Sequence, residues 1–205
     1  MIGMGMLGSR TDAWMARRLE RPDHLRRGLL DLLCLGIAYS LVIALLALGN
    51  VGPGMPSWLA IPTEDYFKWE PLFCTPVIFF AGILAAGVLH LLARANGGHG
   101  TFERTLALVG PVTFIATLFT LIPDTVIGIG LLAGLIDPQQ WMADIVRPSP
   151  TLAIIWVYLL MYLAAFVLLF PRIGRVAHGL RPAAARWSGW LAFLVYQALL
   201  LVFIR

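Results

Sequence analysis

Long apolar stretches alternate with short polar ones along the whole 205-residue chain. A helix that crosses a bilayer needs about 20 apolar residues, and five stretches approach or exceed this length. The sequence therefore predicts spanning helices over residues 32–49, 71–93, 102–122, 151–170 and 187–204. We expect an all-α polytopic membrane protein built as a bundle of five transmembrane helices.

The composition excludes a water-soluble globule. Hydrophobic residues make up 60% of the chain and charged residues 13%, whereas soluble domains contain about 45–50% and about 25%. The pI near 9.5 does not indicate nucleic-acid binding, because the arginines stand in short clusters between apolar stretches. Lys68 is the one lysine beside 14 arginines. This bias favours a bacterial protein of the plasma (inner) membrane.

The third apolar stretch is too long for one crossing. Residues 102–136 as a single helix would measure roughly 50 Å, against a hydrocarbon core of about 30 Å. We expect a break at Pro123 and Asp124, because proline removes a backbone donor and a carboxylate is costly in lipid. Residues 125–136 would then form either a kinked extension or an interfacial helix, with Gly130 and Gly134 allowing another helix to approach.

Arginine placement predicts the orientation. Twelve of the 15 basic residues lie before the first span, after the second and after the fourth. Since basic loops stay on the cytoplasmic side, the N-terminus is predicted inside and the C-terminus outside. The opposite side carries Lys68, Arg147 and Arg205 among acidic residues that include Glu70. No cleavable signal peptide is expected, and the first span should remain as an anchor.

Residues 1–28 form a basic N-terminal segment, which we expect to be cytoplasmic, and residues 29–205 form the membrane domain. A short surface helix is predicted over residues 11–21, with Trp14, Met15 and Leu19 toward lipid, until Pro22 ends it. Its arginines would contact anionic lipid headgroups or would only mark topology. These arginines are Arg10, Arg17, Arg18 and Arg21.

Aromatic residues at the predicted ends of the second and fifth spans indicate membrane interfaces. They are Trp58, Tyr66, Phe67, Trp69, Trp187 and Trp190. Near the estimated midplane the sequence places polar but uncharged side chains, which argues against an ion-coupled transporter. These are Tyr39, Ser40, Thr113, Tyr162, Tyr196 and Gln197. Small residues recur every four positions at Gly36, Ser40 and Ala44 and at Gly82 and Ala86, as in helix packing faces.

Three ionisable residues are the candidate functional side chains of the spans. Asp31 and His90 could meet near the inner ends of the first two spans, either as a bond between helices or as a proton-handling pair. Asp124 either ends the third span in water or binds an ion. No catalytic motif, cofactor motif or metal-ligand spacing is present. Cys34 and Cys74 should lie too far apart for a disulfide.

The loop after the second span is rich in glycine. Gly97, Gly98 and Gly100 superficially suggest a phosphate cradle, but the lysine that such a loop needs does not follow. A turn explains the pattern better. Asn96 and Gly97 would cap the second span, and Thr101 would cap the third, with Glu103 in its first turn.

Two inner loops resemble those of the YIP domain family, the Ypt/Rab-interacting integral membrane proteins. The stretch Gly97-Gly98-His99-Gly100-Thr101-Phe102 is similar to the family's GG-x-G-[ST]-F signature, which opens the third of five spans. Ala177-His178-Gly179-Leu180, followed by alanines at 183–185, looks like its connection between the fourth and fifth spans. The resemblance covers residues 29–205 and implies no catalytic residue. Eukaryotic members are associated with small GTPases, but here the N-terminal region is short.

The sequence thus predicts a non-enzymatic YIP-type protein that acts as a scaffold or partner in membrane organisation or in a larger complex. Its partners would be the bilayer and another membrane protein or a second copy of the chain, and neither a cofactor nor nucleic acid is expected. The alternative is a small transporter or lipid-moving protein. Pro111, Pro123 and the three ionisable residues motivate this alternative.

Overall fold

A computed structural model describes residues 2–53, 59, 61, 62 and 65–204. The described residues form seven helices and confirm the predicted all-α class. Five of them, α2, α3, α4, α6 and α7, are long and apolar enough to cross a membrane. The helices are α1 (Ile2–Leu19), α2 (His24–Leu48), α3 (Tyr66–Ala95), α4 (Phe102–Leu132), α5 (Pro138–Val146), α6 (Pro150–His178) and α7 (Pro182–Phe203).

The predicted break at Pro123 is wrong, because α4 continues without interruption to Leu132. Its 31 residues correspond to about 46 Å of helix, so α4 must tilt or extend beyond the hydrocarbon core. Membrane helices tolerate proline where nearby groups satisfy the freed backbone positions. Of the two alternatives, helical extension holds and a separate interfacial helix over residues 125–136 does not.

The end of α4 explains Gly130 and Gly134 differently from the sequence prediction. Gly134 has φ +68°, and the Leu135 amide donates to the Gly130 carbonyl at 2.9 Å. This is the pattern of a helix ended by a left-handed glycine. Gly130 faces the Ile136 side chain. The two glycines therefore let the chain turn at its own helix end, and a second helix does not pack there.

Side chains cap the helices around the loops. The loop over residues 96–101 is a turn, as predicted, in which Gly98 donates to the Ala93 carbonyl at 2.8 Å. Thr101 accepts from the Arg104 amide. At α5, the Asp137 carboxylate accepts from the Gln140 amide at 2.8 Å and Pro138 occupies the first turn. This combination is favourable at a helix start.

Internal contacts divide the chain into two compact units. Unit 1 comprises residues 1–32, 81–114 and 166–196, and unit 2 comprises residues 33–80, 115–165 and 197–205. Each of the five long helices contributes a segment to both units.

Unit 1 is packed through glycines that bring backbones together. A Cβ atom on Gly28 would lie 2.6 Å from the Ala107 Cα. One on Gly110 would collide with the Gly28 carbonyl oxygen, and one on Gly189 would lie 2.7 Å from the Pro171 Cα. Since lipid gives no hydrophobic drive between helices, such close backbone contact supplies their attraction. Phe166 stacks on Phe193 and Tyr196, with ring centroids 5.1 and 5.4 Å away.

Unit 2 has a core at one end of its helices. It consists of Ile43, Val51, Tyr66, Phe67 and Leu131, all buried. Tyr66 and Phe67 therefore pack in the protein interior, whereas Trp69 is 55% exposed; Trp58 lies outside the described residues. Gly36 packs on the Thr75 backbone, and Ser40 shares a 2.9 Å hydrogen bond with Thr75. The predicted small-residue face of α2 is thus a contact with α3.

Candidate functional site

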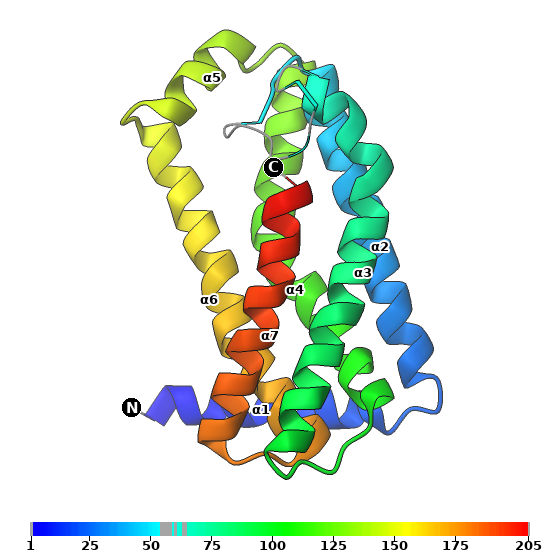
Figure 1. Ribbon diagram of the computed structural model, residues 1–205. Coiled ribbons are helices and arrows are strands. Elements are labelled where there is room, and N and C mark those ends of the chain that lie inside the picture. The colour runs from blue at the N-terminus through cyan, green and yellow to red at the C-terminus, as the bar shows by residue number, and fades with distance from the viewer. Residues whose placement is uncertain (1, 54–58, 60, 63–64, 205) are drawn as a thin grey trace. The chain divides into compact units, whose positions relative to one another are not determined.

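Helix α1 is fastened to unit 1 by acidic residues. Asp12 pairs with Arg172 at 3.1 Å and with Arg175 at 3.2 Å, both near the end of α6. Arg18 pairs with Asp31 near the start of α2. Within unit 1, α1 lies crosswise to the segments of α6 and α7 (Figure 1). Two ion-pair anchors, at Asp12 and Arg18 in the second half of α1, therefore hold the helix in place.

The contacts of α1 correct part of the predicted surface helix. Met15 was expected to face lipid, but it is completely buried against protein. Arg18 was expected at the headgroups, but it binds Asp31 and is only 18% exposed. Arg10, Arg17 and Arg21 remain exposed, and Trp14 and Leu19 are partly exposed. The basic face available to a partner is therefore narrower than the sequence indicates.

The turn between α1 and α2 carries a further ion pair. Arg27 donates to Asp23 at 2.6 Å, four residues away. This hydrogen bond lowers the pKa of the exposed Asp23 carboxyl. Because both side chains are solvated, the pair adds little stability.

Asp31 and His90 do not form the predicted pair. The Asp31 carboxylate has Arg18 as its partner. The His90 ring instead contacts Phe102 and His178, with centroids 6.1 and 5.3 Å away. The proton-handling interpretation of Asp31 and His90 thus loses its geometric basis, and His90 joins a different cluster.

The two family-motif loops meet in unit 1. The His99 amide donates to the His178 carbonyl at 3.2 Å. A Cβ atom on Gly100 would collide with the Ala177 carbonyl, and one on Gly98 would lie 2.9 Å from the His178 Cβ. Glycine at both positions lets the loop lie directly on the end of α6. Gly97 and Gly179 have φ +81° and +69°, and each turns the chain after a helix.

His178 joins the end of α6 to the start of α4. Its Nε2 lies 2.7 Å from the Thr105 hydroxyl, which itself donates to the Thr101 carbonyl at 3.1 Å. Since the hydroxyl has one hydrogen, Nε2 must carry the proton and donate. His178 is 3% exposed. The Nδ1 atoms of His90 and His178 are buried and have no hydrogen-bond partner among the described residues.

This histidine cluster offers no metal centre. Across the described part of the chain, no group of three or more His, Cys, Asp or Glu side chains could hold a metal ion. Cys34 and Cys74 are both free thiols. The chemistry of the cluster is therefore hydrogen bonding and ring contact, which fix the two inner loops to each other.

Unit 2 contains hydrogen bonds between polar side chains inside its spans. The Tyr158 hydroxyl donates to Asp124 at 3.3 Å, and Tyr162 donates to Gln197 at 2.8 Å. Asp124 lies within α4, well before the helix ends at Leu132, so it is not the helix-ending residue that the sequence predicted. Its carboxylate is half-buried and faces α6.

Glu70 is a buried acidic residue that the sequence analysis missed. Its charge was assigned to the outer loop, but Glu70 is completely buried within α3. The signal was the four-residue spacing of Tyr66, Glu70 and Cys74, which places all three on one helix face. Glu70 and Asp124 are thus two carboxylates within candidate spans of unit 2.

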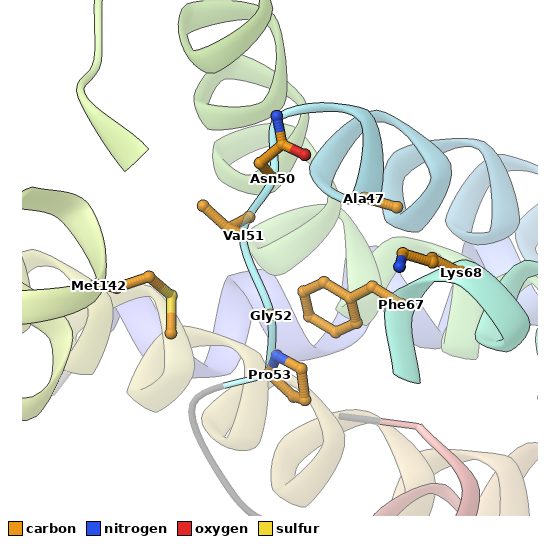
Figure 2. A pocket seen from close by; sticks show the side chains of 8 residues that line it. All are labelled: Ala47, Asn50, Val51, Gly52, Pro53, Phe67, Lys68 and Met142. Atoms are coloured by element: carbon orange, nitrogen blue, oxygen red, sulfur yellow. The ribbon is translucent and has the colours of Figure 1, made fainter. Parts of the chain in front are cut away.

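A recess of about 470 Å³ lies beside the core of unit 2. Figure 2 shows the loop from Asn50 to Pro53 running between Met142 of α5 and the side chains of Phe67 and Lys68 on α3. Asn50 adopts φ +57° and turns the chain after α2. Lys68 pairs with Asp65 at 2.6 Å. The recess combines apolar walls with an amide and a cation.

Comparisons of the chain with protein-family models, with curated proteins and with solved structures give no match. The likeness to the YIP domain family therefore rests on the loop motifs alone and stays a prediction. Any proposal about function therefore depends on the geometry of the two units.

Proposed function

We propose that this polytopic membrane protein is a non-enzymatic scaffold of the YIP type, which binds a partner protein in the membrane through α1 and the two motif loops. The observation that carries the proposal is the fixed, basic α1. Asp12 and Asp31 hold it on unit 1, while Arg10, Arg17 and Arg21 stay exposed. A rigid basic surface costs less entropy on binding than a mobile tail.

The joined loops support the same interpretation. Thr105 and His178 connect the start of α4 to the end of α6, and Asp12 connects α1 to the same helix end. The parts that carry the family resemblance thus form one continuous arrangement with the basic helix. A partner with an acidic segment would find complementary charge there.

Photocrosslinking in the source cells tests the proposal. A photoreactive amino acid replaces Arg17 or Arg21 in turn, and the adducts are identified by mass spectrometry. We expect the same membrane protein at both positions and its absence when Arg147, exposed at the end of α5 in unit 2, is replaced instead. Adducts with lipid only, or different proteins at the two positions, would overturn the proposal.

Substitutions distinguish the effect of the exposed positive charge of α1 on partner binding from the effect of its ion-pair anchors. Arg17→Glu with Arg21→Glu should abolish the adduct formed from a probe at position 10, because the two substitutions reverse the charge of the exposed face of α1. Lys68→Glu with Arg147→Glu makes the same charge change in unit 2 and should leave the adduct intact. Asp12→Asn should weaken it, because Asp12 loses its charge toward Arg172 and Arg175.

A second candidate function is a small transporter or lipid-moving protein. The observation that favours it is the completely buried Glu70, together with Asp124 inside α4. Ionisable groups within spans commonly mark ion or substrate paths. Flux into liposomes, measured for ions and for labelled lipids, should fall in Glu70→Gln and Asp124→Asn. Flux no greater than in empty vesicles would remove this candidate.

A further inference from the structure

A second recess in unit 2 lies among three helices that follow one another along the chain. It measures about 350 Å³ and is lined by Ile122 and Val126 of α4, Trp141 of α5, and Ile154, Ile155 and Tyr158 of α6. Within unit 2, α5 joins the end of α4 to the start of α6 (Figure 1). The recess therefore has walls from two candidate spans and from the short helix that connects them.

The walls are suited to hydrocarbon. The polar side chains in the lining are Thr151 and Tyr158, and the Tyr158 hydroxyl gives its hydrogen to Asp124. A polar occupant would lose its hydration without gaining enough hydrogen bonds from such walls. An alkyl chain makes no hydrogen bonds with water, so it would lose none on entering the recess.

The rim of the recess is in contact with the surrounding medium. Ile122, Val126 and Ile154 are 59%, 64% and 65% exposed. All three belong to helices that are long and apolar enough to cross a membrane, where the medium is lipid. An acyl chain is therefore the occupant with direct access to the recess.

The end of the recess beside α5 has residues suited to a lipid headgroup. Trp141 lines the recess, and Trp is enriched where hydrocarbon meets headgroups. Arg147 caps the C-terminus of α5 and is exposed, four residues before Thr151 in the lining. A guanidinium at this level can bind a lipid phosphate.

We propose that this recess is a binding site for one phospholipid, which is retained with an acyl chain between α4 and α6 and its phosphate at Arg147. The proposal does not depend on a protein partner at α1. It also differs from lipid transport, because a retained lipid does not leave its site.

Crosslinking with a lipid probe tests the proposal on the full chain in nanodiscs. The probe is phosphatidylglycerol with a diazirine in one acyl chain, and the adducts are mapped by mass spectrometry. We expect labelling to concentrate on residues 122–127 and 151–158. Ile155→Trp should reduce this labelling about tenfold, which corresponds to about 1.4 kcal/mol of binding, because the indole fills the recess.

Leu160→Trp is the matched control. Leu160 lies on the same helix, is 59% exposed and is not part of the recess, so labelling should not change. Val126→Trp fills the recess from the opposite wall and gives an independent variant if Ile155→Trp does not fold. Labelling spread evenly along the exposed face of α6, and equal in all three variants, would show ordinary surrounding lipid and overturn the proposal.

The headgroup requires a separate measurement. Native mass spectrometry should detect one phospholipid retained through detergent exchange, and Arg147→Glu should reduce retention of phosphatidylglycerol more than that of phosphatidylethanolamine. Recovery of a second copy of the chain crosslinked at residues 122–127, in place of lipid, would also overturn the proposal.

Discussion

The two units accommodate polar groups within an apolar protein in different ways. Unit 1 uses charged pairs, such as Arg18 with Asp31, together with backbone contact at glycines such as Gly110. Unit 2 uses hydroxyl donors, such as Tyr158 toward Asp124 and Ser40 with Thr75. Both recesses described above also lie in unit 2. Unit 1 is thus closely packed, whereas unit 2 contains recesses that a ligand can enter.

Gly110→Ala should produce the largest loss of stability. The added Cβ would collide with the Gly28 backbone, and backbone atoms cannot rotate away as a flexible side chain can. We expect a decrease of about 3 kcal/mol in the free energy of unfolding, measured in mild detergent. Gly87→Ala in the same unit is the control, because nothing lies within 4 Å of its added Cβ. If both variants were equally stable, close backbone packing would not hold unit 1 together.

Tyr158→Phe should be the next largest change, and it tests unit 2. It removes the hydroxyl that donates to Asp124 and leaves a half-buried carboxylate without this donor. Hydrogen bonds to charged groups contribute about 1.5–3 kcal/mol, and we expect a loss of about 2 kcal/mol of unfolding free energy. Adding Asp124→Asn to Tyr158→Phe should recover part of the loss. A double variant no more stable than the single one would argue against this pairing.

Arg18→Gln should loosen the end of α1, while Asp12 still pairs with Arg172 and Arg175. Because Arg18 and Asp31 are 18% and 31% exposed, the pair should contribute about 1 kcal/mol. Hydrogen exchange should become faster in the second half of α1 and stay unchanged around Gly189. Asp31→Asn should have the same effect, and combining the two substitutions should add little. Fully additive effects would mean that the two residues act separately.

Ser40→Ala with Thr75→Val should give the smallest effect. Hydrogen bonds between membrane helices average about 0.6 kcal/mol in double-mutant cycles, and the Ser40 and Thr75 hydroxyls are 2.9 Å apart. We expect a coupling free energy of this size from the four-variant cycle. A coupling of zero would assign the contact between α2 and α3 to packing at Gly36 alone.

The sequence predicted the helices well because their signal is local. Five apolar stretches and the caps at Thr101 and Gly97 correspond to observed elements. It failed where the outcome depends on neighbouring helices. Pro123 was expected to end a helix, yet α4 continues to Leu132, as a membrane helix can where neighbouring groups satisfy the freed carbonyl.

The candidate site was predicted only in part, for the same reason. The motif residues of the two loops meet, and His90 joins them through His178. The partner of Asp31 could not be predicted, because Arg18 approaches from a separate helix. Glu70 was treated as a loop charge, and only the position where α3 begins shows that it is buried.

The proposed function depends on the number of crossings and on the side of the membrane where each chain end lies. Helix α1 can meet a cytoplasmic partner only if it lies inside. Fusions of a fluorescent protein and of alkaline phosphatase to each end, and into the loops at residues 97 and 137, measure this directly. We expect the N-terminus and residue 97 inside, and residue 137 and the C-terminus outside. Both ends in the same compartment would contradict five crossings, and an N-terminus outside would contradict the placement of α1.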